Sequence, residues 1–384
     1  MPGVYLSYPF CAQKCTFCNF ASDVAKRDEQ ERYDSALERE IREHRWTWKP
    51  ETIYWGGGTP SLMNLESFAA VMSAIPSEDA VEATLECAPG TIDERKLAAW
   101  QRVGINRVSL GVQSFVAAEA QQTGRKHTAE TVSADIALLR SAGISNINID
   151  LIAGLPGQTE ASWRRSLDWL ERLHPPHVSV YLFELDEDSA LGNEALLGGI
   201  RYGAALLPSD DAAAEFYEQA VERLAVLGLP RYEISNFAAP GWESRHNLKY
   251  WRLEPYVGFG LDAHSFDGHL RRANTDDLAN YLNRIESAQP ACEEISESDI
   301  GEEHFFVGLR QSAGIRPTQE EWVRFRSVID FGVTSGLLET DGITVKLTSR
   351  GFLLSNEIFQ QFLDSCSPVA RVQNTRDRIL FYAT

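Results

Sequence analysis

The sequence predicts an α/β protein with a parallel sheet, followed by a smaller α+β domain. Between residue 3 and about residue 240, short apolar runs alternate with helical stretches six times. Each apolar run ends beside a glycine, an acid or an amide, and from about residue 304 the pattern changes to helix, helix, hairpin, helix. Strands that alternate with helices of this length are typical of βαβ units, whose strands run parallel.

The expected strands are short and rich in β-branched residues. They cover residues 4–8, 52–55, 83–86, 107–110, 146–151 and 177–182. Periodicity alone leaves two arrangements open, a barrel and a doubly wound open sheet. In parallel barrels the functional site lies at the C-terminal ends of the strands, so the residues that end these runs are candidates for binding.

Helices are expected between the strands, at residues 27–46, 92–103, 128–142 and 160–172. Two of them are followed by a glycine, Gly104 and Gly143. Glycine suits the left-handed residue that commonly ends a helix, so both glycines support the predicted boundaries.

Three cysteines follow the first strand within eight residues. Cys11, Cys15 and Cys18 have the spacing C-x3-C-x2-C. Three thiolates on one loop can bind three irons of a [4Fe–4S] cluster and leave the fourth iron open, because such clusters normally take four cysteines. Structural zinc and buried cysteines are the alternatives, but zinc is usually completed by a nearby fourth ligand, and the first histidine is His44.

This loop resembles that of the radical S-adenosylmethionine (SAM) superfamily, in which the open iron binds the amino and carboxylate groups of SAM. The flanking Pro9-Phe10-Cys11 and Gln13-Lys14-Cys15 resemble the branch of oxygen-independent coproporphyrinogen III oxidases and HemW-type haem chaperones. The resemblance spans roughly residues 3–364 and implies a partial (β/α)6 barrel. The expected divisions are a core barrel at 1–240, a barrel-closing segment with an acidic connector at 241–300, a winged-helix-like domain at 301–366 and an unassigned tail at 367–384.

The resemblance also implies a SAM site at the strand ends. Gly57, Gly58 and Thr59 match the motif G-G-T-P, which meets the SAM amino group in the family. Tyr5 and Phe17 match residues that pack against SAM, although the residues alone indicate core aromatics. The remaining positions match polar SAM-binding residues: Glu86, Gln113, Arg125 and Asp150.

A second distinctive stretch contains the pattern H-N-x-x-Y-W from His246 to Trp251. A lone histidine is more often a surface or hydrogen-bonded residue than a ligand. The pattern resembles the motif associated with haem binding in the HemW group, and haem iron is commonly held by histidine. His246 is therefore the expected haem ligand, while His264 is expected to be structural.

The remainder of the chain is expected to form a connector and a small domain. Residues 285–303 are polar and acidic, which predicts a connector with a solvated face. Asp341-Gly342 lies between two short strands and favours a hairpin turn. Winged helices often bind DNA, but this one is not basic, so a lid or a docking module is expected.

Composition narrows the function classes. The net charge of −19 argues against a nucleic-acid partner, because phosphate binding favours a basic surface. No apolar run approaches the roughly 18 residues of a membrane span, and no signal peptide precedes the first strand. The scattered Cys87, Cys292 and Cys366 look unpaired. Together these features predict a cytoplasmic protein.

Two functions compete. The first is a haem chaperone that carries haem and a SAM-coordinated cluster and delivers haem to a target protein, with a membrane-associated target among the candidates. The second is oxygen-independent coproporphyrinogen III oxidase, a radical decarboxylase with coproporphyrinogen III dehydrogenase-like chemistry. A weaker third is a radical SAM methyltransferase or a haem-degrading enzyme.

Three departures from the oxidases favour the chaperone. The long extension before the cluster loop is absent, Phe20 replaces a further cysteine, and the H-N-x-x-Y-W pattern is present. One departure fits neither relative, because Ser7-Tyr8 stands where both usually have His-Ile.

Overall fold

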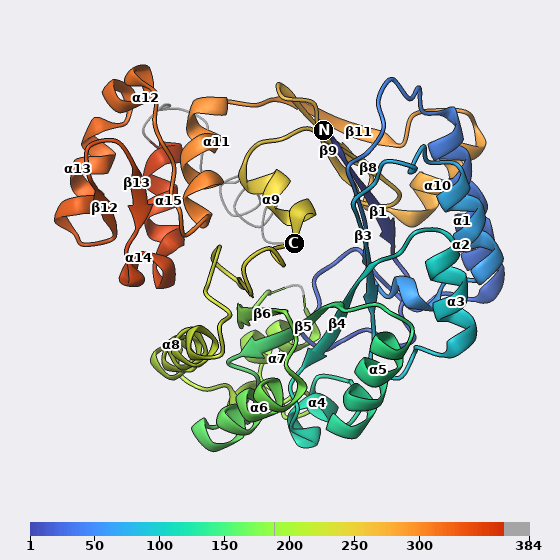
Figure 1. The fold of residues 1–384 in the computed structure, drawn as a ribbon, viewed down its shortest axis with the longest axis horizontal. Helices are drawn as coiled ribbons and strands as arrows, with labels where there is room; N and C mark the ends of the chain where they lie inside the picture. Colours follow the sequence, from blue (N-terminus) through green and yellow to red (C-terminus); the bar gives the residue numbers. More distant parts are fainter. Residues whose placement is uncertain (188, 365–384) are drawn as a thin grey trace.

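The computed structural model describes residues 1–187 and 189–364. Its largest element is one curved sheet with the strand order β11-β10-β9-β8-β1-β2-β3-β4-β5-β6-β7 (Figure 1). The strands are β1 Gly3–Tyr8, β2 Thr52–Gly57, β3 Glu82–Cys87, β4 Arg107–Gln113, β5 Asn146–Ala153, β6 His177–Leu182, β7 Asn236–Ala238, β8 Tyr256–Phe259, β9 His264–Phe266, β10 Leu270–Asn274 and β11 Cys292–Glu297.

The six expected strands are confirmed, and they pair in parallel from β1 to β6. β8 adds a further parallel strand beside β1. The outer strands β7, β9, β10 and β11 are antiparallel to their neighbours. Because β7 and β11 lie at opposite ends of the strand order, the sheet is a partial barrel that stays open.

Helices α1 to α6 cover the convex face of this sheet (Figure 1). Gly104 and Gly143 have φ values of +91° and +87° and follow α3 and α5, as expected from the sequence. The helices up to the sheet's last parallel strand are α1 Arg27–Glu43, α2 Leu65–Ser73, α3 Glu94–Arg102, α4 Ala117–Gln122, α5 Ala129–Ser141 and α6 Glu160–Leu173. The next four are α7 Ala190–Leu197, α8 Asp210–Val226, α9 Arg245–Trp251 and α10 Leu278–Glu286.

The two faces of each parallel strand differ in chemistry. On β4, Val108 and Leu110 point outward into the apolar core under the helices, while Arg107 and Ser109 occupy the alternating inward positions. Successive side chains of a strand point to opposite faces, so one polar residue in two lines the inside of the curve. The interior of the partial barrel is therefore polar.

The C-terminal module, defined here as residues 300–364, has its own apolar core built around residues such as Phe305, Phe325 and Phe362. It lies at one end of the molecule, away from α1 to α3 (Figure 1). A hairpin with the predicted Asp341-Gly342 turn joins its two strands. Its elements are α11 Ile300–Phe306, α12 Gln319–Arg324, α13 Arg326–Thr334, β12 Leu338–Thr340, β13 Val345–Leu347, α14 Ser349–Leu353 and α15 Ser355–Asp364.

Residues 293–297 are exposed, as expected of a solvated face, but the expectation of a connector at 285–303 is wrong. Residues 292–297 form β11, which pairs with β10 at the edge of the sheet. Glu302 and Glu303 are buried, and Glu303 forms an ion pair of 2.6 Å with Arg271 of β10. Acidic composition suggested solvent, but these two acids are buried because cations of neighbouring elements compensate them. The unassigned tail at 367–384 lies outside the described residues.

Candidate functional site

The cysteine loop runs from the end of β1 to the start of α1 and is fixed at three places. The backbone N–H of Cys11 donates to Asp23 (3.0 Å), that of Thr16 donates to Thr123 (3.3 Å), and that of Leu191 donates to Thr16 (2.8 Å). The loop is thus tied to the segment after α4 and to the start of α7. These contacts bring it to the C-terminal edge of the parallel strands.

The three thiols of this loop are free and partly exposed. Burial raises the pKa of Cys11 and of Cys15, and the nearby Arg125 guanidinium opposes that rise at both thiols. The hydroxyl of Thr59 lies 3.4 Å from the Cys11 sulfur. Thiolates are the ligands of iron–sulfur clusters, so a loop with three accessible thiols beside a cation fits such a cluster.

The glycine motif after β2 packs directly on the cysteine loop. The N–H of Gly58 donates to Tyr8 (2.8 Å), and the N–H of Thr59 donates to Phe10 (2.9 Å). A Cβ at Gly58 would lie 2.9 Å from backbone atoms of Phe10, which explains the glycine at this close approach. An ammonium group needs acceptors, which the carbonyl groups of this motif can supply; the carbonyl of Thr59 already accepts from the N–H of Leu62 (3.0 Å).

Glu86 ends β3 inside the curve and receives a hydrogen bond of 2.8 Å from the hydroxyl of Tyr54. Burial is the main cause that raises the pKa of Glu86 to about 8; the bond from Tyr54 lowers it, and the charge of Asp150 raises it. A partly buried carboxyl with a raised pKa at the end of a strand is a candidate for cation binding.

Gln113 is the last residue of β4, and Arg125 lies in the segment after α4, close to the thiol of Cys15. Gln113 has a φ of +66°, and the register between β4 and β5 shifts at this point. A non-glycine residue with positive φ is uncommon and is often associated with function. The Oε1 atom of Gln113 and the Nε atom of Arg125 are buried and have no hydrogen-bond partner in the described part of the chain.

Asp150 is held by two neighbours on the inner face. The hydroxyl of Ser109 donates to its Oδ2 (2.9 Å), and the amide of Asn148 donates to its Oδ1 (2.6 Å). Below it, Nδ1 of His177 lies 2.6 Å from Oδ1 of Asn148, and its Nε2 lies 2.9 Å from the hydroxyl of Tyr232. This network fixes the carboxylate of Asp150 at one position in the wall.

The two predicted aromatic contacts also come to this region. Tyr5 of β1 stacks against Tyr54 with 6.2 Å between ring centroids, and Phe17 of the cysteine loop meets Phe183 edge-on at 6.3 Å. Phe17 lies on the cysteine loop itself, whereas Tyr5 lies within β1, beside Tyr54 and Gly56.

These residues fit the cofactors that the loop implies. An ammonium group seeks carboxylates and carbonyls, and a carboxylate seeks a guanidinium, so Glu86 and the glycine motif suit one end of an amino acid while Arg125 suits the other. The unsatisfied Gln113 Oε1 and Arg125 Nε offer two further groups to a ligand. A [4Fe–4S] cluster on Cys11, Cys15 and Cys18 would supply iron as the anchor for that ligand.

A site for one metal ion, such as structural zinc, needs several ligands that surround the same point. Across residues 1–187 and 189–364, no group of three or more His, Cys, Asp or Glu side chains is placed to hold one metal ion. In a cubane each thiolate binds a different iron, so the three sulfurs need not converge on one point.

His246, the expected haem ligand, is engaged on both sides of its ring. Its Nδ1 lies 2.8 Å from the Thr52 hydroxyl and its Nε2 lies 2.8 Å from the Tyr250 hydroxyl. The ring is fully buried, stacks on Tyr54, and burial lowers its pKa to about 3. Ligation of haem through Nε2 would require the hydrogen bond to Tyr250 to break and the fully buried ring to become accessible, so this geometry favours a structural role for His246.

Sequence reasoning missed the residues that hold the candidate site from below. Tyr54, Ser109 and Asn148 support Glu86 and Asp150, and the buried guanidinium of Arg107 lies at the base of the wall, where it donates to Thr84 (3.5 Å). The signal was the polar residue at every second position of the strands. It is visible in the sequence once the strands are known to curve around an interior.

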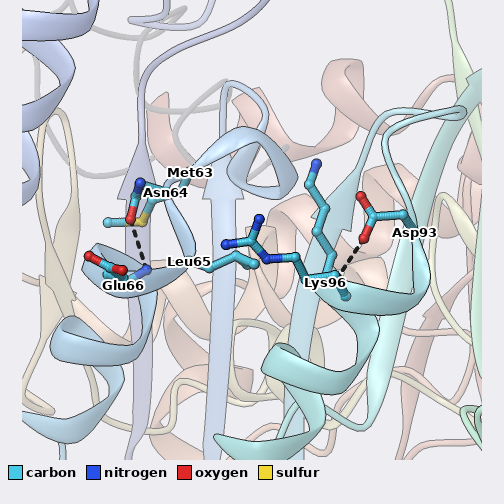
Figure 2. A pocket seen from close by; sticks show the side chains of 7 residues that line it. Met63, Asn64, Leu65, Glu66, Asp93 and Lys96 are labelled. Carbon is cyan, nitrogen blue, oxygen red and sulfur yellow. Dashed lines mark hydrogen bonds between the residues drawn. The ribbon is translucent and has the colours of Figure 1, made fainter.

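A hollow of about 230 Å³ on the outer surface lies between the starts of α2 and α3 (Figure 2). Its polar groups are occupied by helix capping: Asn64 accepts from Glu66, and Asp93 accepts from Lys96. The Lys96 ammonium donates to the carbonyls of Ser61 and Thr91. Because these groups are already paired, this hollow is not a second candidate site.

None of the described helices is long and apolar enough to cross a lipid bilayer.

Comparison with known proteins agrees with the fold. The model of the Radical SAM superfamily matches residues 5–170. Heme chaperone HemW of Bacillus subtilis is 34% identical over 94% of this chain and 99% of its own length. Heme chaperone HemW of Lactococcus lactis is 32% identical over 94% and 97%. The solved structure of coproporphyrinogen III oxidase (HemN) from Escherichia coli aligns with a TM-score of 0.82 and 23% identity, over 94% of this chain and 90% of that one.

A partial parallel barrel with three free thiols on the loop after its first strand defines a protein of the radical SAM class. Within that class, the two HemW proteins match nearly the whole chain at more than 30% identity. The chain belongs to the HemW family.

Proposed function

We propose that this protein is a haem chaperone, which binds haem together with a SAM-coordinated [4Fe–4S] cluster and passes haem to a target protein. The observation that carries the proposal is the similarity to HemW proteins over nearly the full chain. The likeness to coproporphyrinogen III oxidase, at 23% identity, concerns the fold alone.

The proposed cofactor site uses the strand-end residues. Cys11, Cys15 and Cys18 would hold the cluster, and Glu86, Gln113, Arg125 and Asp150 would bind SAM through its charged and polar groups. Gly57, Gly58 and Thr59 would contribute carbonyl oxygens, and Tyr5 and Phe17 would provide apolar contact. The Tyr54 hydroxyl and the Asn148 amide would keep the two carboxylates in place.

We further propose that the protein works in the reducing cytoplasm. Support comes from the described cysteines, which are all free thiols, and free thiols persist where glutathione and thioredoxin keep them reduced. The proposed partners are haem and a haem-accepting protein, with a membrane-associated acceptor among the candidates.

The test compares two activities on one preparation. Protein reconstituted anaerobically with iron and sulfide is titrated with haem, and the Soret band is followed to saturation. The same preparation is supplied with SAM, a reductant and coproporphyrinogen III, and decarboxylated products are measured. We expect saturable haem binding and transfer of haem to an acceptor-containing membrane fraction, without decarboxylation. Turnover of coproporphyrinogen III without saturable haem binding would establish the oxidase instead.

A further inference from the structure

A cavity of about 550 Å³ lies between the segment that precedes β7 and the C-terminal module. It is remote in sequence from the cysteine loop and shares no lining residue with the strand-end site. Its lining is Arg231, Ser312, Gly336, Glu339, Lys346, Leu347, Thr348, Ser349, Arg350 and Phe352.

The charge of this lining is opposite to that of the chain. Arg231, Lys346 and Arg350 are cationic and Glu339 is the one acid among the lining residues, so the cavity carries three positive charges and one negative charge, a net +2. The chain as a whole has a net charge of −19. Glu339 forms an ion pair of 2.9 Å with Lys346 at the exposed rim. A local concentration of cations on an acidic protein attracts anions selectively to that place.

Arg231 is held in a fixed orientation. Its guanidinium carbon lies 3.4 Å from the centre of the Phe352 ring, and its Nη1 donates to the Tyr217 hydroxyl (3.3 Å). Its Nε is buried and has no acceptor among the described residues, and the Oγ of Ser312 in the same lining is buried and unpaired as well. Buried donors are usually paired, and an unpaired one costs free energy. An oxyanion in the cavity would supply acceptors to both groups.

The shape and lining select the size and chemistry of the ligand. A volume of several hundred Å³ suits a small molecule rather than a single ion. Leu347 and Phe352 are the large apolar residues of the lining, and hydroxyls and cations make up most of the rest. A porphyrin needs two broad apolar faces, which this lining does not offer.

We propose that this cavity binds a small molecule with at least two oxyanion groups, such as a diphosphate or a tricarboxylate. Arg231 would bind it from the barrel side, and Ser312, Lys346 and Arg350 from the C-terminal module. The backbone N–H of Ser312 already donates to Tyr232 (2.9 Å), so the two sides meet here. A bound polyanion would therefore also strengthen the attachment of the C-terminal module to the barrel.

The test is calorimetric titration of the reconstituted protein, saturated with SAM, with pyrophosphate in one arm and citrate in the other. The two arms distinguish a phosphate ester from a polycarboxylate as the ligand class. We expect saturable binding in at least one arm. Arg350→Gln and Lys346→Gln should each weaken it by about tenfold, the scale of one charge-assisted hydrogen bond.

Two further variants of the same module sharpen the result. Glu339→Gln removes the one acid of the lining and should tighten binding. Arg326→Gln removes an exposed cation of α13 that pairs with Asp330, outside the cavity, and should leave binding unchanged. Each variant is first checked for an unaltered unfolding midpoint.

The absence of saturable binding in both arms would overturn the proposal. Equal affinities in Arg350→Gln and Arg326→Gln would also overturn it, since they would show a general effect of charge. Neither result bears on the haem-chaperone function, because that function is read from haem binding and transfer.

Discussion

The hydroxyl of Tyr54 on β2 donates a hydrogen bond to Oε1 of Glu86 at the end of β3, with an oxygen–oxygen distance of 2.8 Å. Burial raises the pKa of Glu86 to about 8, and the bond from Tyr54 limits that rise. At neutral pH the free protein therefore holds this carboxyl mainly in its protonated form. A cation that binds there must displace the proton, so binding and deprotonation are coupled.

The first prediction follows from that coupling. SAM binding at pH 7 should release a proton, and SAM affinity should rise with pH until it levels off above the pKa of Glu86, which is about 8. Glu86→Gln should weaken SAM binding by about 1–3 kcal/mol and remove the pH dependence. Tyr54→Phe should move the pH dependence upward, because the bond that lowers the pKa is lost. Calorimetry in two buffers of different ionisation enthalpy measures the proton; unchanged affinity in Glu86→Gln, at equal cluster content, would move the ammonium site elsewhere.

The second prediction concerns the cluster. Cys11→Ala, Cys15→Ala and Cys18→Ala should each abolish assembly of an oxygen-sensitive [4Fe–4S] cluster, measured as iron and sulfide per chain after anaerobic reconstitution. Cys87→Ala removes a buried thiol on β3, and Cys292→Ala removes a partly exposed one on β11; both should assemble a full cluster. If either of these two proved essential, a fourth cysteine ligand would replace the open iron.

The third prediction concerns stability against pH. Burial raises the pKa of Glu40 and of Glu233 to about 7, above the roughly 4.3 of an unfolded glutamate. Above that unfolded value the folded chain keeps protons that the unfolded chain has released, so the free energy of unfolding falls as pH rises through the folded values. Burial lowers the pKa of His127 and of His264 to about 4. Below roughly pH 6.5 the unfolded chain therefore binds protons at these histidines that the folded chain does not, and the free energy of unfolding falls as pH falls. Between about pH 4.5 and 6.5 the carboxyl and histidine effects oppose each other, so a variant of a single group is needed to isolate its contribution.

Urea unfolding across this range measures the effect. Glu40→Gln should flatten the decline of the unfolding free energy between about pH 4.5 and 7, because it removes one group that is protonated only in the folded chain over that range. Its absolute stability should also fall, because Oε1 and Oε2 of Glu40 accept hydrogen bonds from Asn274 (2.9 Å) and Tyr281 (2.7 Å). The comparison is thus between slopes, and a slope identical to that of the wild type would show that Glu40 is ionised at pH 7.

The fourth prediction separates structure from haem binding at His246. His246→Ala should lower the free energy of unfolding by about 3 kcal/mol, because it leaves the buried hydroxyls of Thr52 and Tyr250 without their partner. Haem affinity and the Soret band of the folded variant should stay unchanged. His269→Ala, at an exposed histidine, is the control for both measurements. A lost or shifted Soret band with an unaltered unfolding midpoint would restore His246 as the ligand.

Much of the barrel could be predicted from the sequence because local signals agreed. The six runs of apolar residues, the helices between them and the two glycines at helix ends all appear where expected. The cysteine loop was equally clear, since its spacing is local. The polar inner wall was harder to foresee. The alternation in Arg107, Ser109 and Gly111 is visible in the sequence, but whether a polar face meets solvent, helices or an enclosed interior depends on how the whole sheet curves.

The misjudged segments share one cause. The acidic run at 285–303 is solvated along β11, as expected, but it is no connector, because β11 pairs with β10, and the burial of Glu303 depends on Arg271, more than thirty residues upstream. His246 and its partner Tyr250 belong to the same motif on α9, but its other partner, Thr52, lies on β2, 194 residues upstream. Long-range partners decide these roles, and a linear pattern does not contain them.

An open sheet leaves two edge strands, and β11 is one of them. Its Glu293, Glu294 and Glu297 are exposed beside the apolar Ile295. Unpaired backbone groups on an edge invite a strand from another molecule, and charged side chains on edge strands discourage such pairing. The three glutamates give every copy of the chain the same negative edge, so two copies repel each other there. The acidity that resembled a linker in the sequence thus protects a crowded solution of this protein from strand-to-strand aggregation.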